Sequence, residues 1–431
     1  MKILVIGSGG REHALCWAFS KSEKVKKIYC ANGNAGISEI AECIGIKPEN
    51  ISELADFAEN NEINLTFVGG ETPLAMGIVD EFEKRNLKIV GTSQKAARLE
   101  SSKAFAKEFM ARHSIPTAKF KTAFSTAEAK EILESGFFGD ENTPVVVKAD
   151  GLAAGKGVVV AENRKQAFEA VDELEKLAGT DAAEKIVLEE CLAGREVSLI
   201  LFCDGKNFAL MPPVRDHKRI GEGDTGANTG GMGTISDAGL LSKAQTDEII
   251  GQIIKPTLEG CEKEGFTFKG ILFLGLMMTE SGAKVLEYNV RFGDPETQVI
   301  LVQLDSSLVD VCEAILSGRL DQTDIKWREG SAACVVLASK GYPVKAETGD
   351  VINGLENVSD NSVVVFHAGT AKNENGEFIT HGGRVLGVTA TAEKLETALE
   401  KSYRVVEKIN WNGMQFRTDI GKPLTRIKLP D

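Results

Sequence analysis

The sequence predicts a protein of several α/β and α+β domains. With 431 residues, of which 42% are apolar, the chain is far longer than one small core needs, so we expect two to four domains. Strand and helix patterns alternate through the first hundred residues, which indicates a parallel sheet with crossover helices. Beyond them, strand patterns follow one another with fewer helices between, which is typical of α+β structure.

The first predicted domain covers residues 1–100 and contains the parallel sheet. We expect strands at ILVIG, KKIYCA, LTFVGG and LKIVG, and helices at EHALCWAFSKS, SELADFAENN and AMGIVDEFEKRN. Ligands of such sheets bind at the carboxyl ends of the strands. The segments at those ends are 7–13, 32–36 and 69–74.

The second predicted domain covers residues 101–327. It begins with the capped amphipathic helix SSKAFAKEFMARH, which Pro116 ends. A strand-rich lobe at about 117–192 follows, with one helix, RKQAFEAVDELEKLAG, and the strands PVVVKAD, GVVVAEN and KIVLEE. Later come a helix, AQTDEIIGQIIKPTLEGCEKEG, and two adjacent strands, GILFLGLMMT and AKVLEYNV. The remaining residues, 328–431, form a small α+β domain with strands at AACVVLASKG, NSVVVFHAG and GGRVLGVTA.

Composition excludes several classes of protein. A net charge of -13 argues against general binding to nucleic acid or to an anionic membrane. No apolar run approaches the roughly 18 residues of a membrane span, and Met1 leads directly into a strand pattern rather than a signal peptide. The 8 cysteines contain no C-x-x-C pair, so we expect no disulfide framework and no zinc site. These features predict a cytoplasmic location.

The first strand is followed by GSGGREH, a glycine-rich turn into a helix. It does not match the dinucleotide fingerprint, because Glu12 stands where the third glycine belongs and Asn-Gly-Asn follows the second strand in place of a ribose-binding acid. Gly9 and Gly10 still let the backbone approach an anion at a helix N-terminus. A plain tight turn remains an equal alternative.

A hairpin with two lysines is predicted at VVVKADGLAAGKGVVVA (145–161). It is not a P-loop, because Asp150 and Gly157 stand where glycine and Ser or Thr are required, and a strand rather than a helix follows. Lys148 and Lys156 beside a small-residue tip favour a lid that folds over phosphates. The alternative is an exposed hairpin with solvated lysines.

The segment KVLEYNVRFGDPETQ carries the strongest local pattern. Because strand side chains alternate between faces, Glu287, Asn289 and Arg291 share one face. A carboxylate and an amide oxygen suit Mg²⁺, and an arginine beside them suits phosphate or carboxylate. An amphipathic edge strand with solvated polar side chains is the alternative. In KIVLEECLAGREVSL, by contrast, Glu189 and Glu196 are in themselves unremarkable acids flanking a turn.

Residues 214–233, VRDHKRIGEGDTGANTGGMG, contain six glycines between Gly221 and Gly233 and no apolar period. We therefore expect neither a helix nor a core strand there. Glycines give the backbone room and free N–H donors, which favours a loop around a binding site. A surface loop without fixed structure is the alternative.

Together these motifs resemble the glycinamide ribonucleotide synthetase (phosphoribosylamine–glycine ligase) family of ATP-grasp enzymes. The resemblance extends from Lys2 to about Ile420, and its carriers are GGREHAL, GNAG, ESSKAFAKEF, KADGLAAGKGV, DHKRIGEGDTGANTGGMG and RFGDPETQ. It implies that residues 101–327 form an ATP-grasp core of two α+β lobes, with ATP between two sheets.

The resemblance also implies a set of ATP-binding residues: Lys103, Lys148, Lys156, Glu189, Leu192 and Glu196. In this scheme Lys148 reaches the phosphates, and the loop 151–157 closes over them. Glu189 and the backbone near Leu192 meet the adenine edge, while Glu196 holds the ribose hydroxyls. Glu287 and Asn289 would bind Mg²⁺ or Mn²⁺. Because GILFLGLMM offers no third carboxylate, phosphates and water would complete the metal shell.

The implied reaction is the ATP-dependent ligation of glycine to 5-phosphoribosylamine through glycyl phosphate, which gives glycinamide ribonucleotide, ADP and phosphate in purine synthesis. The implied catalytic residues are Arg291, Lys148, Asp216, His217 and Lys218. The implied substrate-binding residues are Gly9, Gly10, Glu71, Arg291 and Asp294, with Gly9 and Gly10 on the phosphate and Glu71 on sugar hydroxyls or the amine. We expect a monomer, with a dimer as the alternative.

Some positions depart from the family pattern. Val214 and Arg215 stand where Ser-Gln is usual, and Gly70 and Ala227 each replace a usual proline, which puts local loop geometry in doubt. Three rival functions remain open: another ATP-grasp carboxylate–amine ligase, a catalytically silent nucleotide-binding module, and, on GSGG alone, a nicotinamide oxidoreductase.

Overall fold

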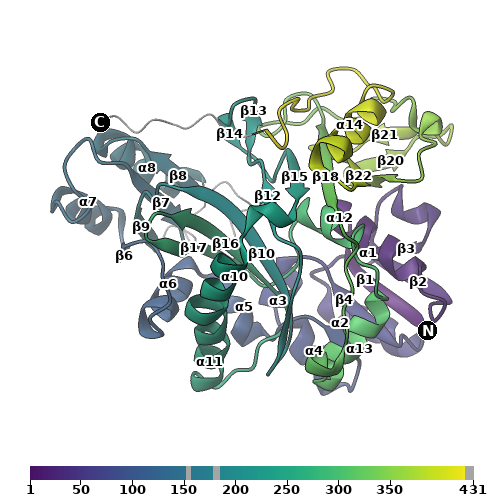
Figure 1. Ribbon diagram of the computed structural model, residues 1–431, viewed down its shortest axis with the longest axis horizontal. Coiled ribbons are helices and arrows are strands. Elements are labelled where there is room, and N and C mark those ends of the chain that lie inside the picture. Colours follow the sequence, from purple (N-terminus) through teal and green to yellow (C-terminus); the bar gives the residue numbers. More distant parts are fainter. Residues whose placement is uncertain (152–156, 178–184, 423–431) are drawn as a thin grey trace.

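The computed structural model describes residues 1–151, 157–177 and 185–422. Figure 1 shows a small lobe carrying α7 and α8 at one end of the molecule. The N-terminal sheet lies at the other end, beside the C-terminal region. A long, curved sheet runs between them. Within the described residues no helix is long and apolar enough to cross a bilayer.

The N-terminal region is the expected parallel sheet, with strand order β3-β2-β1-β4-β5. Its strands are β1 (Lys2–Gly7), β2 (Lys27–Asn32), β3 (Glu42–Ile44), β4 (Leu65–Val68) and β5 (Ile89–Val90). Its helices are α1 (Gly10–Ser20), η1 (Ile37–Glu39), α2 (Ile51–Asn60), α3 (Glu71–Ala75) and α4 (Ile78–Lys84). The chain winds outward on one side of β1 and then on the other, so the β1/β4 edge is the switch point where ligands of such sheets bind.

The small lobe, which we call the lid lobe, is a separate four-stranded sheet with the order β6-β9-β7-β8. Its elements are β6 (Phe120–Ala123), α7 (Thr126–Glu134), β7 (Val145–Ala149), β8 (Val158–Ala161), α8 (Arg164–Leu177) and β9 (Ile186–Glu190). The sequence predicts one helix here, but the described residues of the lobe contain two. Ser125 caps α7 by accepting a hydrogen bond from the Glu128 N–H at 3.1 Å.

The long sheet holds nine strands, in the order β17-β16-β10-β12-β15-β18-β22-β19 with β11 paired to β10. Their bounds are β10 (Arg195–Asp204), β11 (Phe208–Leu210), β12 (Val214–Asp216), β15 (Gly233–Ser236), β16 (Lys269–Thr279), β17 (Gly282–Asn289), β18 (Ser331–Ala338), β19 (Val363–His367) and β22 (Arg384–Ala392). The sheet thus continues from the predicted second domain into the predicted third one. The domain boundaries themselves remain predictions.

The expectation that residues 214–233 contain no core strand is wrong. Both ends of the segment are strands of the long sheet, and β15 is buried throughout. Between them lies an exposed two-stranded hairpin, β13 (Arg219–Gly221) and β14 (Thr225–Asn228). Strands of three or four residues are too short to show an apolar alternation, which is why the pattern concealed them.

The remaining elements support these sheets. They are α5 (Gln94–Ser101), α6 (Lys103–Arg112), η2 (Ala238–Leu240), α10 (Lys243–Ile249), η3 (Ile250–Ile254), α11 (Lys255–Lys263), α12 (Glu296–Leu301), α13 (Leu308–Ser317), η4 (Leu320–Gln322), η5 (Leu355–Asn357), β20 (Thr370–Lys372), β21 (Phe378–Thr380) and α14 (Leu395–Val406). The N-terminal region and the long sheet share two apolar cores, which join Leu4 to Leu274 and Val5 to Phe273. The lid lobe has an apolar core of its own.

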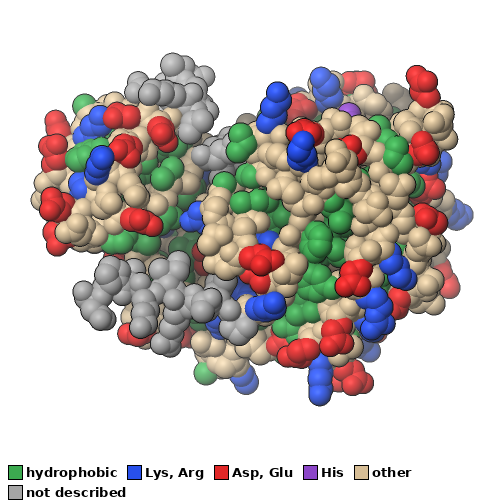
Figure 2. Space-filling model, turned by 90° about the horizontal axis from the view of Figure 1, so that it is seen from above, with side chains coloured by type: hydrophobic (Ala, Val, Ile, Leu, Met, Phe, Trp, Pro, Cys, Tyr) green, Lys and Arg blue, Asp and Glu red, His purple; other side chains and the backbone are tan. Residues whose placement is uncertain are grey.

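Figure 2 shows the lid lobe set apart from the larger body by a hollow, with acidic and basic side chains interspersed on both. The charged side chains on this face therefore form no patch of a single sign.

A glycine marks the close contact between the N-terminal region and the long sheet. Gly270 has φ +105°, and a Cβ there would lie 3.0 Å from the backbone carbon of Gly91. We predict that Gly270→Ala lowers the free energy of unfolding by about 1–3 kcal/mol, because it adds both a clash and backbone strain. Gly251→Ala, in η3 with nothing within 4 Å of its Cβ, is the control and should be neutral or stabilising. Urea titration of both variants tests this, and equal midpoints would contradict it.

Candidate active site

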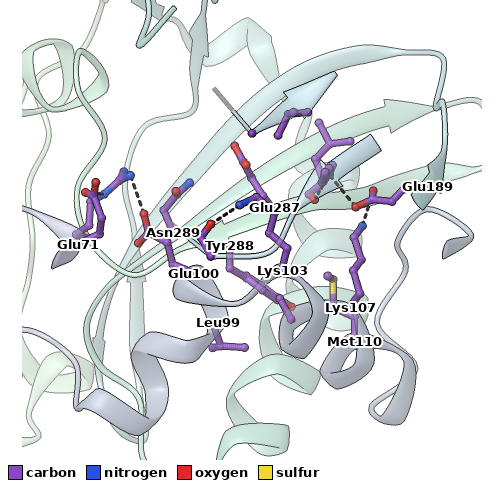
Figure 3. Close-up of a pocket in the computed structure, with 17 residues that line it drawn as sticks. Glu71, Leu99, Glu100, Lys103, Lys107, Met110, Glu189, Glu287, Tyr288 and Asn289 are labelled. Atoms are coloured by element: carbon purple, nitrogen blue, oxygen red, sulfur yellow. Dashed lines mark hydrogen bonds and ion pairs between the residues drawn. The ribbon is translucent and has the colours of Figure 1, made fainter. Parts of the chain in front are cut away.

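A cavity lies between the lid lobe and the long sheet (Figure 3). Its walls come from segments far apart in the sequence: α5 and α6, the ends of β7 and β8, β9, and the end of β17. Lys148 from β7 contacts the Leu286 carbonyl of β17 at 3.4 Å, and Lys218 from the glycine-rich segment lies 3.7 Å from Glu287. The lid hairpin, the 284–291 strand and the glycine-rich segment therefore converge.

At one end of the cavity a single carboxylate holds two lysines. The Glu189 side chain, 2% exposed, lies 2.8 Å from the Lys107 ammonium through one oxygen and 2.8 Å from the Lys148 ammonium through the other. Lys107 also donates to the Thr117 hydroxyl at 2.7 Å. Burial lowers the pKa of Lys107 to about 8, although Glu189 opposes the shift. Buried charges need such partners, since an isolated ammonium is costly away from water.

Lys103 lies at the entrance to the lid loop. Its ammonium donates to the Gly151 carbonyl at 2.7 Å, and burial lowers its pKa. Asp150 fixes the helix that carries Lys103 by accepting hydrogen bonds from the Ser102 hydroxyl and the Ala104 N–H, each at 3.1 Å. Lys156, predicted to contact ATP, lies outside the described residues.

Glu287 and Asn289 stand one repeat apart on β17 and both line the cavity. Burial opposes the ionisation of Glu287, but the charges of Lys218, Lys148 and Lys103 outweigh this effect and hold its pKa below the usual range. A charged carboxylate and an amide oxygen are hard donors that suit Mg²⁺. Among the described residues no cluster of three His, Cys, Asp or Glu could hold a metal unaided. The donor set therefore fits an ion completed by phosphate oxygens and water.

Lys218 lies between Glu196, the predicted ribose contact, and Glu287, the predicted metal ligand. Its ammonium lies 3.3 Å from Glu196 and 3.7 Å from Glu287, and these carboxylates raise its pKa, Glu196 having the larger effect. Glu196 and Leu192 are not among the described residues that line the cavity, so the predicted ribose and adenine contacts of these two lie at its margin.

At the opposite end of the cavity Arg291 is held by two carboxylates. Its Nη2 lies 2.7 Å from Glu100 and its Nε lies 3.1 Å from Glu71. Burial raises the pKa of Glu100 to about 7, with Arg291 opposing that shift. The same burial acts on Glu71, but Arg291 and Arg11 outweigh it and lower its pKa. Two acids around one guanidinium leave this end suited to a ligand with a positive group.

The predicted phosphate site at Gly9 and Gly10 is crowded by carboxylates. The Gly9 N–H already donates to Glu12 at 2.6 Å, and a Cβ on Gly9 would lie 3.0 Å from an Asp294 oxygen. Asp294 is held by Gln298, which donates at 2.8 Å, and by Arg384, whose Nη2 lies 3.4 Å away. A phosphate at Gly9 has to displace Glu12, so this site stays a prediction that the local charges do not favour.

Of the three predicted residues at 216–218, His217 faces backbone on both sides. Its Nε2 accepts a hydrogen bond from the Gly421 N–H at 3.0 Å, so its Nδ1 carries the proton and donates to the Gly233 carbonyl at 3.0 Å. Burial and then Arg215 lower its pKa to about 4. Both ring nitrogens are thus in use, which favours a positioning role over substrate contact. Burial and Glu296 raise the pKa of Asp216.

The sequence reasoning passed over several charged residues of the cavity and its surroundings. Lys107 follows Lys103 by one helical turn, so the i, i+4 spacing could have placed both on one face. Glu100 and Arg384 gave no such signal, because their partners Arg291 and Asp294 lie far away in the sequence.

Three models of one protein family match almost the whole chain. Residues 1–100 match the description phosphoribosylglycinamide synthetase, N domain; residues 101–297 match its ATP-grasp (A) domain; and residues 332–423 match its C domain. Similar proteins named phosphoribosylamine–glycine ligase occur in Caldanaerobacter subterraneus (45% identity, covering 97% of this chain and 99% of the relative) and in Pseudomonas aeruginosa (46% identity, covering 98% and 97%).

Solved structures agree. The phosphoribosylamine–glycine ligase of Thermotoga maritima superposes with a TM-score of 0.83 at 33% identity, covering 98% of this chain and all of that one. The biotin carboxylase domain of a 2-oxoglutarate carboxylase from Hydrogenobacter thermophilus, described in complex with MgADP, gives a TM-score of 0.74 at 18% identity, covering 96% and 91%. At that identity the second likeness concerns the fold alone.

The shared carboxylate of Glu189 gives a prediction about stability. Glu189→Gln leaves two buried ammonium groups side by side, so we expect the free energy of unfolding to fall by about 3 kcal/mol or more. Glu190→Gln, the neighbouring residue on the same strand, removes only a half-exposed contact with Lys284 and should cost less than about 1 kcal/mol. Chemical denaturation at pH 7 compares the two, and a similar loss in both would refute the buried pair.

Lys107 gives a prediction about pH. Between its folded pKa of about 8 and an unfolded value of about 10.4, the unfolded chain holds a proton that the folded chain lacks. Unfolding free energy from this group therefore rises with pH across that window, by up to about 1.4 kcal/mol per unit. The unfolding free energy of wild type minus that of Lys107→Met should increase from pH 7.5 to 9.5. The same difference measured with the exposed Lys243→Met should stay constant. A constant difference would mean that Lys107 keeps an ordinary pKa.

Proposed function

Because this chain belongs to the phosphoribosylglycinamide synthetase family, we propose that it ligates glycine to 5-phosphoribosylamine at the expense of ATP. The products are glycinamide ribonucleotide, ADP and phosphate. The observation that carries the proposal is that Lys148 at the base of the lid hairpin and the donors Glu287 and Asn289 line one cavity, with Lys218 of the glycine-rich segment 3.7 Å from Glu287. Family matches that span almost the whole chain support the same function.

The first step joins two anions. An oxygen of the glycine carboxylate attacks the γ-phosphorus of ATP, the bond to the β-phosphate oxygen breaks, and ADP leaves with that electron pair. On this acidic molecule the reaction needs local positive charge, which Lys103 and Lys148 supply in the lining of the cavity and Lys218 supplies beside Glu287. Such cations, already fixed before the reaction, lower the barrier without reorganising. ATP phosphates would compete with Glu189 for Lys148.

Glu287 and Asn289 would hold a Mg²⁺ or Mn²⁺ ion. When bound, such an ion neutralises phosphate charge and polarises the γ-phosphoryl group. Glu189, which lies beside Lys107 at one end of the cavity, is the proposed contact of the adenine edge. Glu196, beside Lys218, is the proposed ribose contact.

In the second step the amine of phosphoribosylamine attacks the acyl carbon of glycyl phosphate and phosphate leaves. We assign the amine or sugar to the end of the cavity at Glu71 and Arg291, where Glu100 adds a further carboxylate. Asp294, held by Arg384 and Gln298 close to Gly9 and Gly10, is the proposed contact on the side of the N-terminal sheet. A monomer in the cytoplasm remains the prediction from sequence.

The function is tested by ADP release in four mixtures, with ATP and Mg²⁺ present throughout: no addition, glycine, phosphoribosylamine, and both. We expect rapid ADP release only with both, together with glycinamide ribonucleotide detected by mass spectrometry. ATP turnover that does not depend on glycine would remove the proposal and favour another ligase of the ATP-grasp class.

The metal assignment has its own test. Glu287→Ala should abolish turnover, by at least about a hundredfold, because the carboxylate donor is lost. Glu280→Ala, at the exposed turn of the same β16–β17 hairpin, should leave turnover unchanged. Normal turnover by Glu287→Ala would show that the metal lies elsewhere.

Glu71→Ala should mainly weaken phosphoribosylamine binding. The variant loses an acid that faces the proposed amine site and also frees the Nε of Arg291. We expect the KM for phosphoribosylamine to rise about tenfold, while the KM for ATP stays within about twofold. A change in the KM for ATP alone would place Glu71 in the nucleotide site instead.

A further inference from the structure

The last described segment of the chain, residues 415–422, lies against the glycine-rich hairpin β13–β14, about two hundred residues earlier in the sequence. Figure 1 shows this yellow segment beside β13 and β14. Residues 222–227 of the hairpin are almost all exposed, so the hairpin has no apolar core of its own. A lone two-stranded hairpin is marginal in water, and its conformation must therefore come from elsewhere.

Arg417 provides the central contact. Its side chain is 1% exposed, and its Nε and Nη2 donate to the two oxygens of Asp419 at 2.7 and 2.8 Å. Its Nη1 donates to the Asp224 carboxylate at 2.7 Å and to the Arg219 carbonyl at 3.0 Å. One planar guanidinium thus joins the first strand and the turn of the hairpin to the last described segment, with geometry that a flexible ammonium does not reproduce.

The neighbours of Arg417 make further contacts with the hairpin. The Gly223 N–H donates to Asp419 at 2.8 Å, and the Thr418 hydroxyl contacts Glu222. The segment itself is anchored to α14, because the Tyr403 hydroxyl donates to the Arg417 carbonyl at 2.8 Å. These hydrogen bonds and ion pairs tie the hairpin to the C-terminal region.

A second grip lies at the base of the hairpin. The Gly421 N–H donates to His217 Nε2 at 3.0 Å, and Arg215 donates to the Lys422 carbonyl at 3.0 Å. These contacts fix the His217 ring in its Nδ1–H form. His217 lies between Asp216 and Lys218, the residue whose ammonium bridges Glu196 and Glu287.

We propose that residues 415–422 are a positioning element of the active site, which holds the glycine-rich hairpin through Arg417 and Asp419 and so places Lys218 at the ATP and metal subsites. The segment touches none of the reacting groups itself. Its effect passes through the hairpin and the His217 ring to the two side chains that flank this histidine. The inference rests on the proposed ligase function and assigns a task to the C-terminal region in that reaction.

Asp224→Asn tests the grip without disturbing the backbone. Asp224 has φ 57°, a conformation that asparagine tolerates well, so the variant removes the charge and keeps the turn. The matched control is Asp56→Asn, which breaks a surface ion pair with Arg85 on the N-terminal region. Arg417→Lys is a second variant, which keeps the charge but loses the fork.

For Asp224→Asn we expect two changes and one unchanged value, whereas Asp56→Asn should match wild type in all three measurements. Amide hydrogen exchange in peptides covering 214–233 becomes faster, with no change at β7. The kcat falls by on the order of tenfold to a hundredfold, because small misplacements of a catalytic group have effects of that size. The dissociation constant for ATP in the absence of glycine stays within about twofold. Nitrogen chemical shifts of His217, one of 5 histidines, should show the Nδ1–H tautomer in wild type.

Several outcomes would overturn the inference. Unchanged exchange in Asp224→Asn would mean that the ion pair does not hold the hairpin, and faster exchange with unchanged kcat would mean that the hairpin position does not matter for catalysis. If Arg417→Lys does not fold, the Asp224→Asn result decides. Wild-type protein without glycine-dependent turnover would count against the ligase function, whereas active wild type with an unaffected Asp224→Asn variant would count against the positioning element alone.

Discussion

The cavity depends on the pairing of positive charge with carboxylates from distant segments. Three cations of its lining have such partners: Lys107 and Lys148 share Glu189, and Arg291 meets Glu71 and Glu100. Beside the cavity, Lys218 meets Glu196 and Glu287. Unpaired charges away from water would be too costly to keep in a folded protein. The pairing therefore lets an acidic molecule concentrate ammonium groups where a triphosphate and a carboxylate are proposed to meet.

The long sheet brings these segments together. Its strands run from β17, which carries the proposed metal donors, through β12 and β15 of the glycine-rich segment, to β18 and β22 of the C-terminal region. Arg384, at the start of β22, reaches Asp294, while the N-terminal sheet packs on the same body through two shared apolar cores. One continuous ladder of backbone hydrogen bonds thus fixes, relative to one another, residues that lie almost two hundred positions apart.

Patterns within short windows of sequence predicted several of the helices, though not α7, α12, α13 or α14, and most of the apolar strands, because apolar periodicity is a local property. The shared face of Glu287, Asn289 and Arg291 follows from strand alternation in the same way, and all three line the cavity. The strands β12 and β15 escaped because three or four residues are too short to show an apolar alternation. The partners of Arg417 and Arg291 escaped because they are distant in the chain. Resemblance to a family supplied residue roles that no local pattern contained.

The lid lobe and the glycine-rich hairpin differ in how they are held. The lid lobe has its own apolar core, so it can shift as a unit while the cores of the body stay intact. The glycine-rich hairpin has no core and keeps its position through directional contacts to Arg417 and Asp419. Glycines are needed where backbone lies this close to other groups, as at Gly231, where a Cβ would lie 2.6 Å from Asp216. They also deprive the hairpin of apolar side chains, and a buried guanidinium from the far end of the chain compensates for that loss.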